Sequence, residues 1–107
     1  MSGLVASIWF DNLGQISIGP HCCLSQGALL LCGNHDYKRP AFDLMVGDIT
    51  LEDGVWIGAR ASVAPGVRCR SHAVLAMGST LTRDAEAWSI HQGNPAVKVK
   101  NRTMHPA

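Results

Sequence analysis

Apolar residues recur at every sixth position along the centre of the chain, over residues 45–86. The first residue of each six-residue unit is apolar: Met45, Leu51, Ile57, Val63, Cys69, Leu75 and Leu81. The fifth residue is small or aliphatic: Ile49, Val55, Ala61, Val67, Ala73, Ser79 and Ala85. A period of six fits neither an amphipathic helix, whose apolar positions recur about every 3.6 residues, nor a long strand, whose apolar positions alternate. It fits short strands joined by tight corners, with the first and fifth residues pointing into one shared interior.

The fourth residue of each unit is the expected corner. It is glycine or aspartate in most units: Asp48, Gly54, Gly66, Gly78 and Asp84, with Arg60 and His72 as exceptions. A left-handed backbone costs little only at glycine and is tolerated by Asp or Asn. Three strands and three corners make one triangular coil, and stacked coils bury the first and fifth positions while sharing backbone hydrogen bonds. The pattern therefore predicts an all-β solenoid of stacked coils.

An earlier block, over residues 18–35, repeats the pattern. Its corners are expected at His21, Gly27 and Gly33. Residues 4–15 fit the pattern only loosely, and Ile16 and Ser17 form a two-residue insertion before the units that start at Ile18.

Together, the repeat regions 4–35 and 45–86 predict about four coils within a single domain over residues 1–107. The repeat stops between them. Residues 36–44, which include a proline, several charges and two aromatic residues, are expected to form a loop thrown out from one corner. Functional residues often lie in loops held by a rigid scaffold. The remaining residues, 87–107, are expected to form a C-terminal tail.

Two polar residues stand directly before this loop. Asn34 is the only frankly polar residue among the clear fifth positions, and His35 follows it. A buried amide requires a hydrogen-bond partner, and the pKa of an imidazole suits a general base. The pattern alone leaves two interpretations equally open: a catalytic histidine beside a supporting amide, or a turn asparagine followed by a surface histidine.

Composition and charge exclude several classes of function. The formal net charge is +1 and only 16% of the residues are charged, so the chain lacks the electrostatic footprint of a nucleic-acid-binding protein. No apolar run approaches the roughly 20 residues of a membrane span, and the N-terminus has no signal-peptide pattern. The four cysteines form no CxxC pair, and Cys22 and Cys69 occupy inward positions. We therefore expect a cytoplasmic protein whose cysteines are small core residues.

Several short motifs stand in a characteristic order and spacing. They are FDNL at 10–13, SQGA at 25–28, GNHDY at 33–37, PAF at 40–42, GVWIGARA at 54–61, PGV at 65–67 and GNPA at 93–96. From about Trp9 to Arg102 this pattern resembles the sugar O-acetyltransferases of the hexapeptide-repeat superfamily. The likeness is greatest to the colanic-acid-biosynthesis type, and the maltose, galactoside and streptogramin acetyltransferases are more distant. The resemblance implies a left-handed parallel β-helix, a homotrimer with active sites between neighbouring β-helices, and acetyl-CoA as co-substrate.

The resemblance also implies roles for individual residues. It places the catalytic general base at His35, which would take a proton from an acceptor hydroxyl as that oxygen attacks the thioester. Residues that would support the histidine or the acceptor are Asn34, Asp36, Asp11 and Trp56. Positions that would contact CoA are Ala59, Met77, Gly78, Thr82, Arg83, Lys98, Lys100 and Arg102. Two alternatives stay open: Trp56 as a packing residue between subunits, and the basic residues of the tail as a solvated end.

Two other readings compete with an O-acetyltransferase acting on a sugar or similar hydroxyl. The family usually carries a segment before the first coil that helps shape the acceptor pocket, whereas this chain begins almost at that coil; a shortened, non-catalytic trimeric β-helix protein is therefore the alternative. A zinc enzyme of the γ-carbonic-anhydrase type is the other. It needs three convergent ligands, and the five histidines include no closely spaced pair: His21, His35, His72, His91 and His105. We expect no metal.

Overall fold

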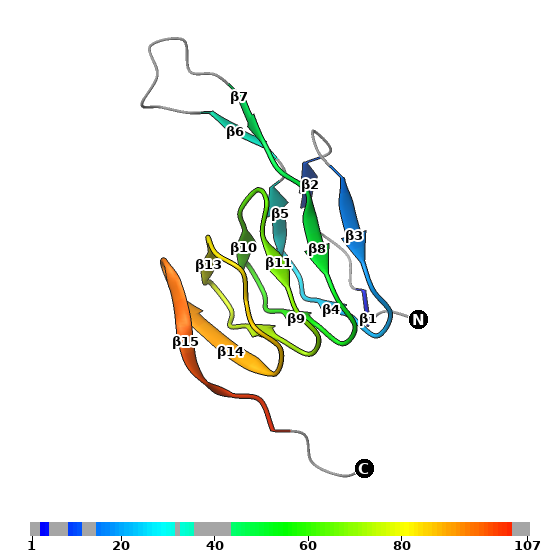
Figure 1. Cartoon of the computed structure of the whole chain (residues 1–107), viewed down its shortest axis with the longest axis vertical. Helices are drawn as coiled ribbons and strands as arrows, with labels where there is room; N and C mark the ends of the chain where they lie inside the picture. The colour runs from blue at the N-terminus through cyan, green and yellow to red at the C-terminus, as the bar shows by residue number, and fades with distance from the viewer. Residues whose placement is uncertain (1–2, 5–8, 12–14, 32, 36–43, 104–107) are drawn as a thin grey trace.

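The computed structural model describes residues 3–4, 9–11, 15–31, 33–35 and 44–103. In this part of the chain the regular secondary structure is β-strand throughout, with no helix (Figure 1). Most strands are only two or three residues long, as the period of six predicts. They stack into three parallel sheets that form the sides of a coiled body, and the prediction of an all-β solenoid is confirmed.

The three sheets are defined by strands that recur once per coil. The first sheet contains, in spatial order, β1 (Gly3–Leu4), β4 (Cys23–Leu24), β9 (Trp56–Ile57), β12 (Val74–Leu75), β14 (Ser89–Gly93) and β15 (Ala96–Asn101). The second contains β2 (Trp9–Asp11), β5 (Leu29–Leu31), β10 (Ser62–Val63) and β13 (Thr80–Leu81). The third contains β3 (Ile16–Ile18), β8 (Ile49–Leu51) and β11 (Arg68–Cys69). All neighbours within them are parallel except β14 and β15, which form an antiparallel pair.

The register between coils shows where the repeat is regular and where it is not. Ser62 pairs with Thr80, 18 positions later, which is the period of one coil of three six-residue units. In the first coil Trp9 pairs with Leu29, 20 positions later, so this coil has two more residues than a regular one. Ile16 and Ser17, predicted to be the insertion, instead lie within β3 and pair with β8. In the last coil Val74 pairs with Ile90, only 16 positions later. Leu29 pairs with Ser62, 33 positions later, because this coil also contains the residues between β5 and β8. The coils of 18 residues therefore lie between this long coil and the short last one.

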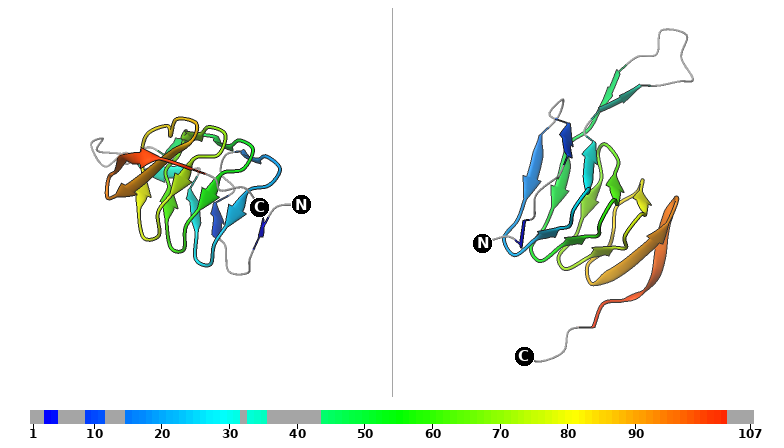
Figure 2. Two further views of the ribbon diagram at one scale, coloured as in Figure 1. Left: turned by 90° about the horizontal axis from the view of Figure 1, so that it is seen from below. Right: turned by 180° about the vertical axis from the view of Figure 1, so that it is seen from behind.

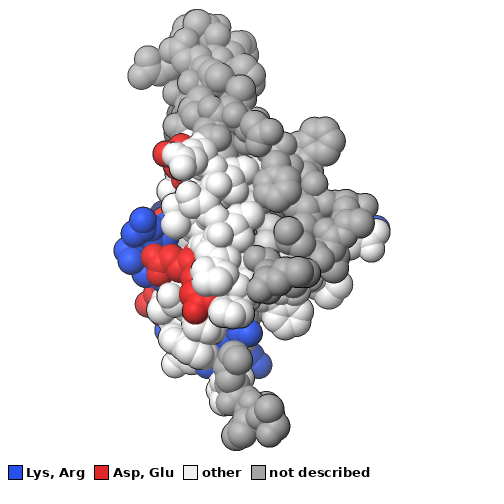
Figure 3. Space-filling view, turned by 90° about the vertical axis from the view of Figure 1, so that its right-hand side faces the viewer, with Lys and Arg blue, Asp and Glu red and all other residues white. Residues whose placement is uncertain are grey.

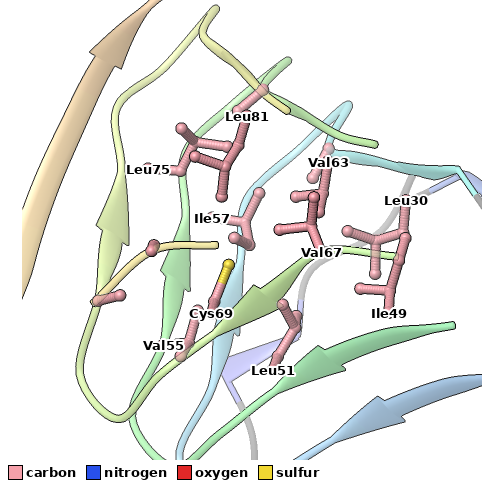
Figure 4. Packing of buried hydrophobic residues seen from close by; sticks show 14 of the residues in the cluster. Leu30, Ile49, Leu51, Val55, Ile57, Val63, Val67, Cys69, Leu75 and Leu81 are labelled. Carbon is pink, nitrogen blue, oxygen red and sulfur yellow. The ribbon is translucent and has the colours of Figure 1, made fainter. Parts of the chain in front are cut away.

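The interior is filled by the residues that the repeat assigns to it. Every first and fifth position over 49–85 is at most 2% exposed, including the small residues Cys69, Ala73 and Ser79. Figure 4 shows side chains from successive coils pointing toward one another inside the body. Dense packing of aliphatic groups at these positions supplies the hydrophobic stabilisation of the solenoid.

The fourth residues of the units lie at the corners, as predicted, and the left-handed backbone is found at non-glycine corners as well. Gly54, Gly66 and Gly78 have φ between 70° and 78°, and so do not pay the usual cost of a side chain in this conformation. The predicted exceptions adopt the same geometry, with φ of 57° at Arg60 and 63° at His72. Among the described corners, the aspartates work differently. Their carboxylates accept backbone N–H bonds of 2.9 Å, Asp48 from Gln15 and Asp84 from Arg68.

Two predicted boundaries are corrected by the structure. Gly33, expected at a corner, begins β6 (Gly33–His35), which pairs antiparallel with β7 (Leu44–Val46). Met45 therefore belongs to this ribbon and does not open a stacked coil, and Leu44 lies in a strand instead of the loop. Residues 36–43 lie outside the described part. Figures 1 and 2 show the ribbon projecting from the body at the end opposite the first sheet.

The predicted tail is the second correction. Ser89–Gly93 (β14) continues the first sheet by pairing with β12, and Ala96–Asn101 (β15) folds back beside it through a turn at Asn94 and Pro95. The inward positions of this last coil hold Ser89 and His91, which are 0% and 7% exposed. Because these residues are polar and the coil is two residues short, the six-residue pattern does not predict this last coil.

Candidate functional site

A cavity of about 310 Å³ opens at the corner between the first and second sheets, and we call it the corner cavity. Its lining comes from strands of three successive coils and the turns that follow them: Ser25, Trp56, Gly58, Ala59, Val74, Leu75, Ala76 and Met77. Apart from the Ser25 hydroxyl and the Trp56 indole N–H, these side chains are apolar or absent. The corner cavity thus suits a narrow ligand with apolar surface.

Small residues let the backbones of adjacent coils approach closely at this corner. Gly58 N–H donates to the Leu75 carbonyl at 2.8 Å, and Gly78 N–H donates to the Ala59 carbonyl at 2.9 Å. A Cβ added at Gly58 would lie 2.6 Å from the Met77 backbone nitrogen, which is closer than atoms can pack. Met77 itself is 74% exposed. Only glycine therefore fits at position 58 without separating the coils.

Trp56 stands beside this cavity on the outer face of the first sheet. Its side chain is outward because its neighbour Ile57 points into the core, and residues of a strand alternate between faces. The indole Nε1–H donates to the Ser25 Oγ at 3.0 Å, which fixes the orientation of the ring. Trp56 remains 45% exposed, so a large aromatic surface is available.

A second cavity, of about 550 Å³, adjoins the first at Trp56 and Val74, which line both, and we call it the strand cavity. Its lining is Trp56, Val74, Ile90, Lys100, Asn101, Arg102 and Thr103. Register explains this set: Trp56 pairs with Val74, Val74 with Ile90, and Ile90 with Lys100, so the four form one row across the first sheet. An aromatic ring and a cation therefore flank an apolar floor, with Trp56 and Val74 common to both cavities.

The cations of the C-terminal strand have different surroundings. Lys98 forms an ion pair with Glu86, and the hydrogen bond and charge of Lys98 lower the pKa of that carboxyl. Arg102 Nη1 donates to the carbonyls of Gly54 at 2.9 Å and of His72 at 3.2 Å. Among the described residues, Lys100 forms no ion pair. The basic segment is thus fixed to the body, and Lys100 is the cation free to meet a ligand.

The remaining predicted site residues lie at another corner. His35 and Asn34 belong to β6, whose backbone alone is described, as is that of Asp11 in β2; Asp36 lies outside the described residues. Thr82 and Arg83 are exposed and follow β13 at the corner between the second and third sheets. The ribbon leaves the body at this same corner, between β5 and β8 (Figure 1). One copy of the chain therefore keeps the ribbon apart from the two cavities.

Ser25 and the buried pair Ser89 and His91 are absent from the predicted site residues. Ser25 belongs to the SQGA motif, which is its only sequence signal. The Ser89 Oγ lies 3.2 Å from the His91 Nδ1, and burial lowers the pKa of His91, with Lys98 adding to the shift and Glu86 opposing it. These polar groups close the end of the core next to the hairpin of β14 and β15.

The described part of the chain contains no group of three or more His, Cys, Asp or Glu side chains placed to hold a metal ion. No helix within the described ranges has the length and apolar character to cross a bilayer. In Figure 3, acidic and basic side chains lie near one another at one margin, and no broad patch of a single sign is visible on that face.

Sequence comparison finds related acetyltransferases, although no protein-family model matches the chain. A chloramphenicol acetyltransferase from Klebsiella aerogenes is 30% identical over 113 aligned positions, covering 86% of this chain and 54% of the relative. WcaF of Escherichia coli strain K12, named as a colanic acid biosynthesis acetyltransferase, is 32% identical over 91 positions, covering 85% of this chain and 50% of the relative. The chain thus spans about half the length of the curated relatives it matches.

Structural comparison finds the same fold. A hexapeptide-repeat-containing acetyltransferase from Vibrio cholerae O1 biovar eltor, crystallised with acetyl coenzyme A, superposes with a TM-score of 0.73. The match covers 96% of this chain and 70% of that protein, at 20% sequence identity. At that level of identity the likeness shows the fold alone, and function has to be argued from the site.

Proposed function

We propose that this chain, which is homologous to the hexapeptide-repeat acetyltransferases over most of its length, is the β-helix of an acetyl-CoA-dependent O-acetyltransferase. The acceptor is a hydroxyl of a sugar or a similar small molecule. The proposal includes a left-handed coil of about four turns in one domain, and a homotrimer with its sites between copies. The two relatives named as acetyltransferases support the reaction class.

The observation that carries the proposal is the corner cavity. The pantetheine arm of CoA is narrow, flexible and largely apolar, with two amides that need backbone partners. A cavity walled by Ala59, Met77 and the Gly58 backbone lets such an arm lie against the main chain, because no large side chain intervenes.

The strand cavity offers a matching place for the nucleotide end of CoA. Lys100 supplies a cation for a phosphate, and the exposed face of Trp56 offers a surface for stacking. Since both cavities share Trp56, one elongated ligand can occupy the two together. In this arrangement Arg102 holds the C-terminal strand in place through the carbonyls of Gly54 and His72, and its positive charge also faces the cavity that it lines.

His35 supplies the acid–base chemistry in this proposal. Its neutral imidazole takes the proton of the acceptor hydroxyl as the oxygen attacks the thioester carbon. The imidazolium then protonates the departing CoA sulfur. General acid–base assistance of this kind contributes about 10²–10⁴ in rate. The acyl group passes directly from CoA to the acceptor, so the chemistry needs no covalent enzyme intermediate and no role for the cysteines.

A site shared between copies accounts for the distance between the ribbon and the cavities. The ribbon projects from the corner between the second and third sheets, whereas the corner cavity opens between the first and second. A neighbouring copy that presents its ribbon to this cavity brings His35 and the CoA arm together. Rotational symmetry then builds one such site at every subunit contact.

Calorimetric titration with acetyl-CoA tests the proposal, using a variant that fills the corner cavity. We expect the wild type to bind acetyl-CoA at one site per chain, and Ala59→Trp to lose binding because the indole occupies the space of the arm. Val99→Trp, which adds the same group at a half-exposed position outside both cavities, is the matched control and should bind as wild type. Absence of binding by the wild type would leave the non-catalytic β-helix as the better account.

A further inference from the structure

Ser25 is the hydroxyl of the corner cavity, and its hydrogen-bond partner fixes the direction in which it can act. The indole N–H of Trp56 is a donor only, so the Ser25 Oγ must accept the 3.0 Å bond between them. The hydroxyl hydrogen is therefore left for another acceptor. Among the described residues it donates to none, although Ser25 lines the cavity.

The position of this hydroxyl is fixed by the backbone as well. Ser25 N–H donates to the Ile57 carbonyl at 2.9 Å, and the Ser25 carbonyl accepts from Ala28 N–H at 3.1 Å. Ser25 thus holds the same position in its coil as Gly58 holds in the next coil. The backbone of Ser25 is held by these bonds and its hydroxyl oxygen by the indole, which makes the hydroxyl a preorganised donor.

The surroundings strengthen a donor in this place. The other lining side chains offer no hydroxyl, carboxylate or amide, so a carbonyl oxygen bound here would find Ser25 as its side-chain donor. A hydroxyl that already accepts a hydrogen bond is polarised and donates more strongly, and exclusion of water enhances the effect. A ligand with a carbonyl oxygen is therefore the chemical class that this group recognises.

We infer that the Ser25 hydroxyl donates a hydrogen bond to the carbonyl oxygen of the acyl thioester in the corner cavity, with Trp56 as the residue that positions it. The inference rests on the proposed function. When the acceptor oxygen attacks, a C–O bond forms and the π pair of the carbonyl moves onto its oxygen, where Ser25 stabilises the charge. When the carbonyl re-forms, the C–S bond breaks and the sulfur takes its proton from the imidazolium. Ser25 keeps its own proton throughout.

The expected effect of Ser25→Ala is on kcat. Loss of one donor to a developing oxyanion lowers kcat by about 10²-fold, whereas binding of CoA, which has no acyl carbonyl, should be unchanged. Ser25→Thr keeps a hydroxyl and should retain most of the rate. Ser17→Ala, a serine on the outer face of the third sheet, is the matched control and should behave as wild type.

Trp56→Phe tests the positioning role because it keeps an aromatic ring but removes the N–H. We expect a partial loss of kcat, and no further loss when this change is added to Ser25→Ala, since the two groups act as one unit. Additive losses would overturn the role given to Trp56.

Three outcomes overturn the role of Ser25 itself. One is an unchanged kcat in a Ser25→Ala protein that melts at the wild-type temperature. Another is a weakened affinity for CoA at unchanged kcat, because the hydroxyl would then hold an amide of the pantetheine arm. The third is a Ser25→Thr protein that folds and is as slow as Ser25→Ala. If the wild type itself releases no thiol from acetyl-CoA with any acceptor, the proposed function fails, and that result is distinct from all three.

Discussion

His72 and Trp88 stack ring on ring, with centroids 4.2 Å apart and planes 6° from parallel. Both occupy left-handed corners of successive coils, with φ of 63° and 58°. Below them, a Cβ added at Gly54 would lie 2.5 Å from the His72 Cδ2, so the imidazole ring packs directly over this glycine. The three residues form a column along one corner of the body, and Arg102 joins its carbonyls to the C-terminal strand.

Trp88→Ala should therefore lower the free energy of unfolding by about 1–2 kcal/mol, of which about 0.5–1.5 kcal/mol comes from the ring stack. Urea unfolding measures this difference. Trp88→Phe retains a ring and should lose less. Equal stability of the alanine variant and the wild type would show that the stack adds nothing to the fold.

Gly58→Ala should destabilise the protein by about 1–3 kcal/mol, the usual cost of forcing an extra carbon into a packed site. The new methyl group meets the Met77 backbone, which cannot move aside as a flexible side chain would. The same displacement widens the corner cavity, so acetyl-CoA should bind more weakly.

Gly66→Ala separates the effect of crowding from that of backbone conformation. A Cβ at Gly66 meets nothing within 4 Å, but its φ is 78°, so only the conformational cost of about 1–2 kcal/mol applies. Acetyl-CoA affinity should be unchanged in this variant. Equal losses of affinity in the two variants would contradict the role of close packing at Gly58.

Stability should fall as pH drops from about 7.5 to about 5.5 because of His91. Burial lowers the pKa of His91 in the folded protein below its ordinary value of 6.5. Between the two pKa values the unfolded chain binds more protons than the folded one, so acid favours unfolding in that window. Thermal melts across this range measure the effect.

The His91→Gln variant provides the comparison. It cannot be protonated, so its melting temperature should change less over the same pH range than that of the wild type. Keeping the pH above about 5.5 leaves Glu86 ionised, since its pKa is lowered by Lys98. An unchanged pH dependence in His91→Gln would assign the effect to other groups.

Complementation between two inactive variants tests the shared site. His35→Ala lacks the proposed base and Ala59→Trp lacks the CoA cavity, so each protein alone should release no thiol from acetyl-CoA. Co-expressed chains can combine an intact ribbon of one copy with an intact cavity of another, and part of the activity should return. A mixture as inactive as its components would indicate a site contained in one chain.

The six-residue repeat made the core residues predictable, whereas the parts of the fold where the repeat is irregular could not be predicted from it. Inward positions such as Leu51 and Val63 were identifiable because one physical requirement, burial, selects the same residue types in every coil. The last coil was not predicted because its inward residues Ser89 and His91 are polar and give no hydrophobic signal. Ser89 Oγ lies within hydrogen-bond distance of His91 Nδ1 and donates to the Glu86 carbonyl. The antiparallel pairing of β6 with β7, around Asn34, could not be predicted because strands of the ribbon follow the same short apolar pattern as strands of a coil.

The candidate site was partly visible in the sequence. Ala59 and Met77 were selected by resemblance, and the structure places both in the lining of one cavity. Ser25 was missed because its significance lies in a contact with Trp56, 31 positions away, which no local pattern encodes. Arg102 was assigned to a ligand, whereas its guanidinium also bonds two carbonyls, because sequence shows the charge of a side chain but not its partners.

The release of free thiol from acetyl-CoA in the presence of sugar acceptors tests the central claim most directly. We predict that the wild type releases thiol only when a hydroxyl acceptor is present. His35→Ala should abolish this release while leaving the melting temperature nearly unchanged. No release from the wild type with any hydroxyl acceptor, or full release from a folded His35→Ala protein, would contradict the account.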